Sequence, residues 1–133
     1  MSKFIIQGGN PLRGKVKISG SKNASTPIIA ATLLTRQKSV LENVPKIRDV
    51  NNLLDILKGM GADIKWVGDH KLEIQCKDIS LDKLDRKAVK KMRSSVLLLG
   101  PLLARFRSVE NFPEPGGCII GNRPLDAHFA AFK

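Results

Sequence analysis

The sequence predicts a domain of mixed helix and strand, α/β or α+β, built from a duplicated supersecondary unit. Three observations predict this class: short segments of alternating polarity, apolar residues at helical spacing, and a motif that occurs twice. Residues 39–45 (SVLENVP) recur as residues 108–113 (SVENFP), one residue shorter. A leucine pair precedes each copy, at 33–34 and 102–103, so the period is 69 residues. That period is too long for a solenoid repeat and suits a duplicated unit.

The first unit opens with a strand, a helix and a second strand. Polar and apolar residues alternate over 16–19, which is typical of a short strand. A turn over 20–23 leads into a helix that continues to about Leu34, with Pro27 acceptable in its first turn. Residues 39–44 form the next strand.

A second helix and a hairpin complete this unit. Asp49 is the predicted N-cap of the helix, which ends at Gly61. Residues 63–67 and 71–75 form a hairpin around the Gly68-Asp69 turn. The apolar face of the helix has the spacing i, i+3, i+4, i+7, and consists of Val50, Leu53, Leu54 and Leu57.

The second unit repeats this pattern with one longer loop. Four residues separate Pro45 from Val50, whereas eleven separate Pro113 from Leu125. A loop lengthened in one copy only is a candidate for function. The helix that follows has the same apolar spacing, formed by Leu125, His128, Phe129 and Phe132. No C-cap or hairpin follows it, so we expect the chain to be part of a longer protein.

Composition limits the classes of partner. The 23 basic and 12 acidic side chains give a net charge of +11, which favours anionic partners. Aromatic residues make up only 5%, which argues against a stacking surface for single-stranded nucleic acid. The two cysteines form neither a disulfide framework nor a CxxC zinc motif. The start is too short and polar for a signal peptide, and the longest near-apolar run, 96–104, is too short for a membrane span. We therefore expect a soluble cytoplasmic protein without a metal.

The longer loop carries the residues with the most reactive chemistry. Glycines at 116, 117 and 121 surround Cys118, and Arg123 follows five positions later. A positive field favours the thiolate and raises reactivity, so Cys118 is either a reactive thiol or a small buried residue. Cys76 ends an alternating strand and is predicted to be structural.

Two predicted helix starts carry polar or cationic residues at equivalent places in the repeat. Lys22 and Asn23 open the first helix, and Arg93 opens its counterpart. Amides at a helix start together with a lysine can hold a phosphate or carboxylate. Taken alone, residues 20–23 are better explained as a polar helix cap with a solvated lysine, but the two equivalent starts together suggest one shared anion site. Residues 86–93 carry five positive charges, typical of a solvated helical face.

The last helix offers an acidic and a titratable side chain. Asp126 suits the positive N-terminal end of that helix. His128 falls on the apolar face, so it is either a core histidine or a residue that reaches the loop or a ligand.

Three motifs in this order and spacing resemble the enolpyruvyl transferases, and among them the UDP-N-acetylglucosamine 1-carboxyvinyltransferases. They are residues 19–24 (SGSKNA), 91–95 (KMRSS) and 115–126 (PGGCIIGNRPLD), and the resemblance runs from about Phe4 to Lys133. It implies the inside-out α/β barrel of that family, with two domains of three units each. Residues 1–17 would then be a strand that packs with the other, mostly absent domain. Residues 18–133 would be a partial domain with units at 18–77 and 78–133.

The resemblance also implies a reaction, without a cofactor or metal. The 3′-hydroxyl of UDP-N-acetylglucosamine attacks C2 of phosphoenolpyruvate, a proton reaches C3, and phosphate leaves. This is the first committed step of peptidoglycan synthesis, so cell-wall growth, cell shape and division depend on it. The implied partners are the two substrates and the missing C-terminal part, with no nucleic acid and no membrane.

The family's site residues carry over by motif. Cys118 corresponds to the proton donor that fosfomycin alkylates. Lys22 and Asn23 correspond to residues that contact both substrates, and Arg93 and Arg123 to residues that bind anionic groups. The uridine side corresponds to Pro124, Leu125, Asp126, Ala127 and His128. The family's base lies beyond Lys133, so we expect this chain to be inactive alone.

Three alternatives remain open. The first is a shikimate-pathway enolpyruvyl transferase, against which the cysteine loop and the Lys22-Asn23 pair argue. The second is a basic nucleic-acid-binding module that uses residues 86–91 with Arg105 and Arg107. The third is a degenerate piece that serves only in protein interaction.

Overall fold

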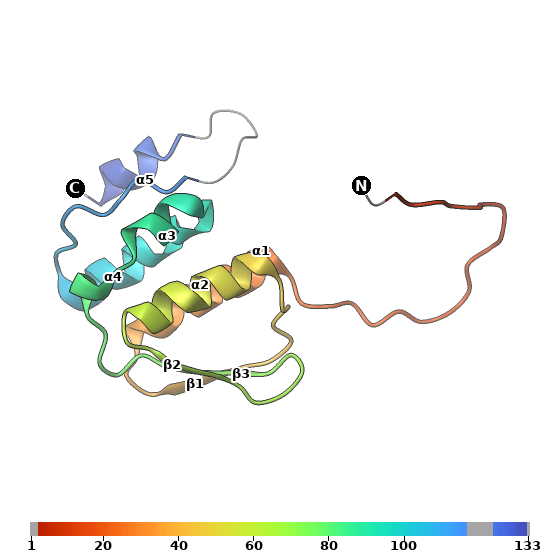
Figure 1. Ribbon diagram of the computed structural model, residues 1–133, viewed down its shortest axis with the longest axis horizontal. Helices are drawn as coiled ribbons and strands as arrows, with labels where there is room; N and C mark the ends of the chain where they lie inside the picture. Colours follow the sequence, from red (N-terminus) through yellow and green to blue (C-terminus); the bar gives the residue numbers. More distant parts are fainter. Residues whose placement is uncertain (1–2, 117–123, 133) are drawn as a thin grey trace.

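The computed structural model describes residues 3–116 and 124–132, and it confirms the mixed α/β class (Figure 1). A three-stranded antiparallel sheet lies under a layer formed by α1 and α2, and the helices of the second unit stack beyond them. The first unit consists of α1 (Lys22–Ala31), η1 (Thr32–Leu34), β1 (Lys38–Leu41), α2 (Arg48–Gly59), β2 (Asp63–Trp66) and β3 (Leu72–Gln75). The second consists of η2 (Leu81–Lys83), α3 (Arg86–Lys91), η3 (Arg93–Leu98), α4 (Leu99–Phe106) and α5 (Asp126–Ala131).

The sheet has the order β1-β3-β2, with the predicted hairpin formed by β2 and β3. The turn closes with a hydrogen bond from the Val67 N–H to the Lys71 carbonyl, 2.9 Å long. On central β3, Leu72 and Ile74 are fully buried, because successive side chains of a strand point to opposite faces and these two face the helices.

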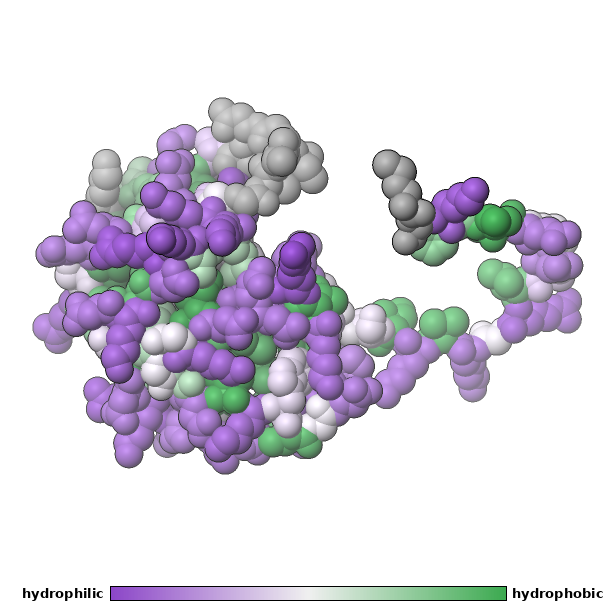
Figure 2. All heavy atoms as spheres, viewed as in Figure 1, coloured by the Kyte–Doolittle hydropathy of each residue, from purple (hydrophilic) through white to green (hydrophobic). Residues whose placement is uncertain are grey.

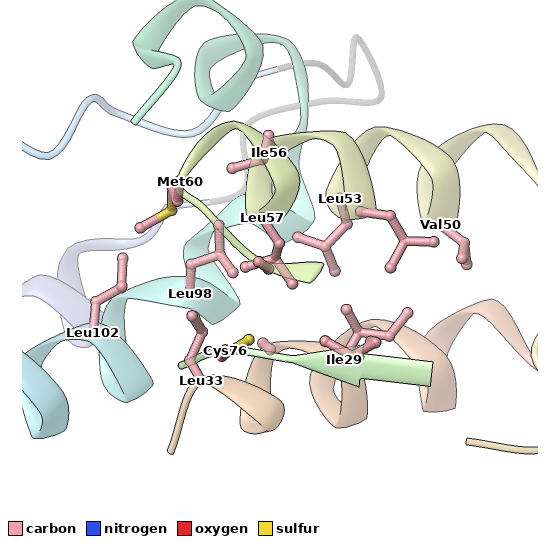
Figure 3. Close-up of a cluster of buried hydrophobic side chains, with 14 of the residues drawn as sticks. Ile29, Leu33, Val50, Leu53, Ile56, Leu57, Met60, Cys76, Leu98 and Leu102 are labelled. Atoms are coloured by element: carbon pink, nitrogen blue, oxygen red, sulfur yellow. The ribbon is translucent and has the colours of Figure 1, made fainter. Parts of the chain in front are cut away.

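One hydrophobic core joins the two units (Figure 3). The apolar face predicted for α2 is buried as expected, and it meets side chains from α1 and η1. Leu98 of η3 and Leu102 of α4 enter the same cluster and are fully buried. Helix α2 ends where Gly61 takes a φ of +110°, and a Cβ there would lie 2.6 Å from the Asp78 carbonyl oxygen. This confirms Gly61 as the helix stop.

Arg105 of α4 also ties the units together. Its Nη1 donates to the Leu33 carbonyl at 2.9 Å, and its Nη2 donates to the Lys77 carbonyl at 2.8 Å. Both carbonyls lie at ends of first-unit elements, where helix and strand hydrogen bonding has stopped. The guanidinium fork therefore joins the second unit to two separate segments of the first.

The predicted strand over 16–19 is wrong in this structure. Residues 3–16 run away from the domain, 17–19 pass beside residues 42–43 and 69–71, and no part of 3–19 has strand structure (Figure 1). The apolar side chains of this segment are exposed (Figure 2). Val16 and Ile18 are 88% and 83% exposed. A strand needs a hydrogen-bonded neighbour, and none of the described strands pairs with this segment.

The second copy of the repeated motif also differs from the first. Residues 108–113 contain a turn at Glu110-Asn111 instead of a strand. The first copy forms β1 because it pairs with β3 in a register from Lys38↔Gln75 to Leu41↔Leu72. In the described part of the second unit there is no counterpart of β3, so the backbone of 108–113 has no ladder to join.

Two local predictions at helix starts need correction. Ile47, not Asp49, occupies the N-cap position of α2, and Asp49 lies in the first turn, where it pairs with Lys22 instead. Pro27 lies well inside α1, beyond its first turn. Because Pro27 has no N–H, the carbonyl of Asn23 lacks the bond that residue 27 would otherwise donate.

Candidate active site

Three helix starts converge on one pocket of about 370 Å³. The first turns of α1, α2 and η3 line it, and the end of α3 closes one side. We call it the Lys22–Arg93 pocket. Its lining residues are Lys22, Asn23, Thr26, Asp49, Asn52, Lys91, Met92, Arg93, Ser94, Val96 and Leu97. The pocket therefore brings together the three residues that the repeat placed at equivalent helix starts.

Lys22 is the first residue of α1 and its charge is already partly engaged. Its Nζ lies 2.9 Å from Oδ2 of Asp49, and the two side chains are 50% and 41% exposed. An ion pair this open to water stabilises the fold by at most about 1 kcal/mol. An incoming anion can therefore compete with Asp49 for the lysine at little cost.

Gly20 determines where α1 begins. The backbone of Gly20 packs so closely on residues 43–45 that a Cβ at this position would collide with the Asn43 carbonyl oxygen. Asn43 itself has a φ of +56°, and the Val44 N–H donates to the His70 carbonyl at 3.0 Å. The hairpin thus fixes the turn at 43–44, and this turn sets the place of Lys22 two residues after Gly20.

Arg93 is the first residue of η3 and is half-buried. The adjoining backbone is anchored by Ser95, which is fully buried. The Ser95 hydroxyl lies within hydrogen-bonding distance of two main-chain carbonyl oxygens, that of Val89 at 2.9 Å and that of Met92 at 2.5 Å. These contacts join the end of α3 to the start of η3, so the position of Arg93 follows from both elements.

The electrostatics of the pocket favour anions. Lys22, Lys91 and Arg93 contribute three positive charges against the single carboxylate of Asp49. Helix starts add partial positive charge and backbone N–H donors, most strongly for the longer helices α1 and α2. The amides of Asn23 and Asn52 supply neutral donors. The pocket is suited to a phosphate or carboxylate group.

Asp49 and Asn52 are two polar pocket residues that were not predicted to belong to the site. They stand three residues apart at the start of α2, so they share one face of the helix, opposite in character to its apolar face. That polar spacing was the available signal, but a capping role explained Asp49 equally well from sequence.

The remaining predicted site residues lie elsewhere. Cys118 and Arg123 fall outside the described residues. Pro124 to His128 form the entry and first turn of α5, with Leu125 half-buried and the other four exposed. None of these five lines the Lys22–Arg93 pocket in the described part of the chain. Because His128 is exposed, the interpretation of it as a core histidine is wrong.

Cys76 is structural, as the sequence predicted. It follows β3, is fully buried, and its Sγ lies 3.7 Å from the Thr32 hydroxyl. Burial raises the pKa of the Cys76 thiol, because an apolar environment disfavours the thiolate. The Thr32 contact and the charge of Arg105 act in the opposite direction and are smaller. Cys76 is thus an unreactive thiol.

The basic segment 86–91 is only partly a solvated face. Arg86 Nη1 donates to the Asn111 carbonyl at 2.6 Å.

Among the residues that the structure describes, no three His, Cys, Asp or Glu side chains gather as a metal site. No helix in those same ranges is long and apolar enough to cross a membrane.

Comparison with known proteins decides the family. The profile described as EPSP synthase (3-phosphoshikimate 1-carboxyvinyltransferase) matches residues 6–133, nearly the whole chain. The chain belongs to this family. The resemblance to enolpyruvyl transferases drawn from the three motifs is thereby confirmed.

Relatives in the family agree with each other on a narrower name. UDP-N-acetylglucosamine 1-carboxyvinyltransferase 1 of Carboxydothermus hydrogenoformans is 47% identical over 133 residues, all of this chain and 31% of the relative. UDP-N-acetylglucosamine 1-carboxyvinyltransferase of Cellvibrio japonicus is 45% identical, with the same coverage. The chain thus spans about a third of the length of these enolpyruvyl transferases.

A solved enolpyruvyl transferase has the same fold over the shared part. The crystal structure of NikO from Streptomyces tendae superposes with a TM-score of 0.63 at 28% identity. The match covers 74% of this chain and 23% of NikO. The fold class predicted from the sequence is that of an enolpyruvyl transferase.

Proposed function

We propose that the protein to which this chain contributes transfers the enolpyruvyl group of phosphoenolpyruvate to the 3′-hydroxyl of UDP-N-acetylglucosamine and releases phosphate. The observation that carries the proposal is the Lys22–Arg93 pocket, where Lys22, Asn23 and Arg93 meet at three helix starts. Relatives that match the whole chain bear the name of this activity. Because the chain spans 31% of their length, the proposal concerns the completed protein, in which further residues supply the base.

The pocket has the charges that this transfer requires. Phosphoenolpyruvate carries a phosphate and a carboxylate, and Arg93 and Lys22 are suited to these groups as a planar fork and a point charge. Phosphate gains charge as its bond to C2 breaks, so fixed cations and helix starts that face it lower the barrier. Asp49 would release Lys22 to the substrate as it binds.

Cys118 is the proposed proton donor to C3, and Arg123 a second anion-binding residue. The uridine side is assigned to residues 124–128. Their support is the motif match, together with the exposure of Asp126, Ala127 and His128 in the first turn of α5, which leaves them accessible to a large nucleotide. Asp126 and His128 offer an acceptor and a donor to a base or ribose.

The setting of the reaction is part of the proposal. We assign the protein to the first committed step of peptidoglycan synthesis, in the cytoplasm, and therefore to cell-wall growth and division. The exposed apolar side chains of residues 3–19 support the expectation that 1–17 pack on another domain of the completed protein, beside the units at 18–77 and 78–133.

One observation weakens the nucleic-acid alternative. Its footprint needed Arg86 and Arg105 as phosphate contacts, but both guanidinium groups donate to main-chain carbonyls. These arginines serve the fold, which reduces the charge available to a nucleic-acid backbone.

The proposal is tested on the chain completed with the downstream two thirds of the Carboxydothermus hydrogenoformans relative. Phosphate release should require both phosphoenolpyruvate and UDP-N-acetylglucosamine. Lys22→Met and Arg93→Met should each lower kcat/KM on the order of 100-fold, the effect of removing one charge-stabilising group. The control is Lys65→Met, which removes a β2 cation outside the pocket and should leave kcat/KM unchanged.

Two further results separate the alternatives. Fosfomycin should add a single adduct, located on Cys118 and absent from buried Cys76. Release of phosphate with 3-phosphoshikimate as the acceptor, and none with the UDP-sugar, would contradict the proposal in favour of the shikimate-type activity.

A further inference from the structure

The segment 111–116 lies along α3 and leads directly to residues 117–123 (Figure 1). Its first residue is attached to the first residue of the helix, because Arg86 Nη1 donates to the Asn111 carbonyl at 2.6 Å. Asn111 has a φ of +53°, so the chain turns at this residue. The hydrogen bond therefore holds the segment at Asn111, the residue at which the chain turns.

The far end of the segment lies against the other end of α3. Gly116 lies so close to the helix that a Cβ would collide with the Lys90 carbonyl oxygen. Between these ends, Pro113 and Pro115 are buried. Residues 111–116 are thus held against one short helix at both ends.

Arg86 and Asn111 both line two hollows at the surface. A hollow of about 590 Å³ lies beside their hydrogen bond, lined by Arg86, Lys90, Asn111 and residues 113–116. A second hollow of about 350 Å³ has Arg86 and Asn111 again in its lining. Both hollows are open to solvent, whereas Pro113 and Pro115 are buried, so packing holds the middle of the segment and the Arg86 bond holds its start. Loss of the guanidinium would free the Asn111 end of the segment.

Helix α3 also reaches the Lys22–Arg93 pocket. Lys91, its last residue, lines that pocket, and Arg93 follows two residues later. The same short helix therefore fixes one wall of the pocket and the segment that precedes Cys118. Any change in how 111–116 sit on α3 changes where the following chain starts relative to the pocket.

We propose that Arg86 is a positioning residue of the enolpyruvyl transfer. Through Asn111 it fixes segment 111–116 on α3, so that the chain leading to Cys118 starts from a set place beside the Lys22–Arg93 pocket. The catalytic part of this inference rests on the proposed function, whereas the anchoring part concerns this chain alone.

Anchoring is tested on the 133-residue chain with a protease specific for glutamate. Glu110 and Glu114 lie in or next to the segment and are exposed, while Glu42 and Glu73 serve as internal reference sites. Arg86→Met should speed cleavage after Glu110 several-fold, measured by mass spectrometry, with the reference sites unchanged; the bond after Glu114 is resistant in every variant, because Pro115 follows it. Arg86→Lys keeps a cationic donor, so its cleavage rate should fall between those of Arg86→Met and the wild type. The control Lys87→Met removes a neighbouring charge on the same helix and should cleave as wild type does.

The catalytic role is tested on the completed protein described above. Arg86→Met should lower kcat on the order of tenfold, as small displacements of a reacting group do, with KM for phosphoenolpyruvate close to wild type. Arg86→Lys should recover part of kcat, and Lys87→Met should leave it unchanged.

Each outcome decides one statement. If Arg86→Met is cleaved at the wild-type rate, the statement that Arg86 anchors segment 111–116 is overturned, whatever value kcat has. If Arg86→Met is cleaved faster but its kcat equals that of the wild type, so that any loss of kcat/KM comes from a higher KM, the positioning role is overturned. The proposed function is then unaffected. A completed wild-type protein that releases no phosphate overturns the proposed function and the catalytic half of the inference with it.

Discussion

Replacing Gly20 with alanine adds one methyl group at the place where α1 begins. That methyl would collide with the Asn43 carbonyl oxygen, and it would lie 2.9 Å from the Asn43 carbonyl carbon and 3.0 Å from Cδ of Pro45. All three atoms belong to the backbone or to a proline ring, so no flexible side chain can move aside. The turn at 43–45 and the start of α1 must separate.

The cost of the substitution follows from two opposing effects. Overpacking a tight site destabilises by about 1–3 kcal/mol, and rigid backbone neighbours favour the upper end of that range. Alanine restricts the unfolded chain more than glycine does, and this effect alone stabilises the folded state by about 0.4–1 kcal/mol. We expect Gly20→Ala to lower the free energy of unfolding by about 2 kcal/mol. With a urea m-value of about 2 kcal/mol/M, the unfolding midpoint falls by about 1 M.

Urea titration of the 133-residue chain checks this value through the fluorescence of Trp66, the only tryptophan in the sequence. The matched control is Gly59→Ala at the end of α2, where the nearest atom to an added Cβ is the Lys83 carbonyl oxygen at 3.9 Å. That variant should be neutral or stabilised by up to about 1 kcal/mol. Equal midpoints for Gly20→Ala and wild type would refute the argument that this close approach positions α1 and Lys22.

Two further predictions concern titratable groups. Burial and its raised pKa should keep Cys76 unmodified by a thiol reagent in the native chain, with labelling only in urea, and rapid native labelling of Cys76 would contradict its packing. Lys71 Nζ lies 2.8 Å from Glu42 Oε1, and this hydrogen bond lowers the pKa of Glu42 below 4.5 and raises that of Lys71 above 10.5. The small stabilisation by the pair should therefore persist between these values, and disappear as the pH falls through the lowered pKa of Glu42 or rises through the raised pKa of Lys71. Glu42→Gln should flatten the acid limb of the urea midpoint measured between about pH 3 and 5, and an unchanged acid limb would count against the pair.

Local patterns predicted most of the first unit. The apolar spacing of α2, the Gly61 stop and the Gly68-Asp69 turn all depend on residues close together in the chain, and the structure has each of them. Lys22 and Arg93 were placed at helix starts because the repeat aligned them, and each is the first residue of its helix. The motifs predicted the family before any fold was known.

The predictions that failed needed a distant partner. Residues 16–19 and 108–113 alternate or repeat like strands, but the described part of the chain provides no strand beside them. Asp49 is not an N-cap, because α2 begins at Arg48 with Ile47 before it, and the Asp49 carboxylate lies 2.9 Å from Lys22 of another helix instead. Nothing in the local sequence distinguishes these cases, since hydrogen bonding and ion pairing depend on what the rest of the fold brings near.

The sequence by itself determined the family, the short helices and hairpin, and the residue types of the anion site, because periodicity, turns and motifs are properties of neighbouring residues. Only the tertiary structure decided that Asp49 and Asn52 join Lys22 and Arg93 in one pocket, and that Arg86 binds the Asn111 carbonyl 25 residues away. These contacts join segments distant in the chain, and they form because a single core packs α1, α2, η3 and α4 together and excludes water from their apolar faces.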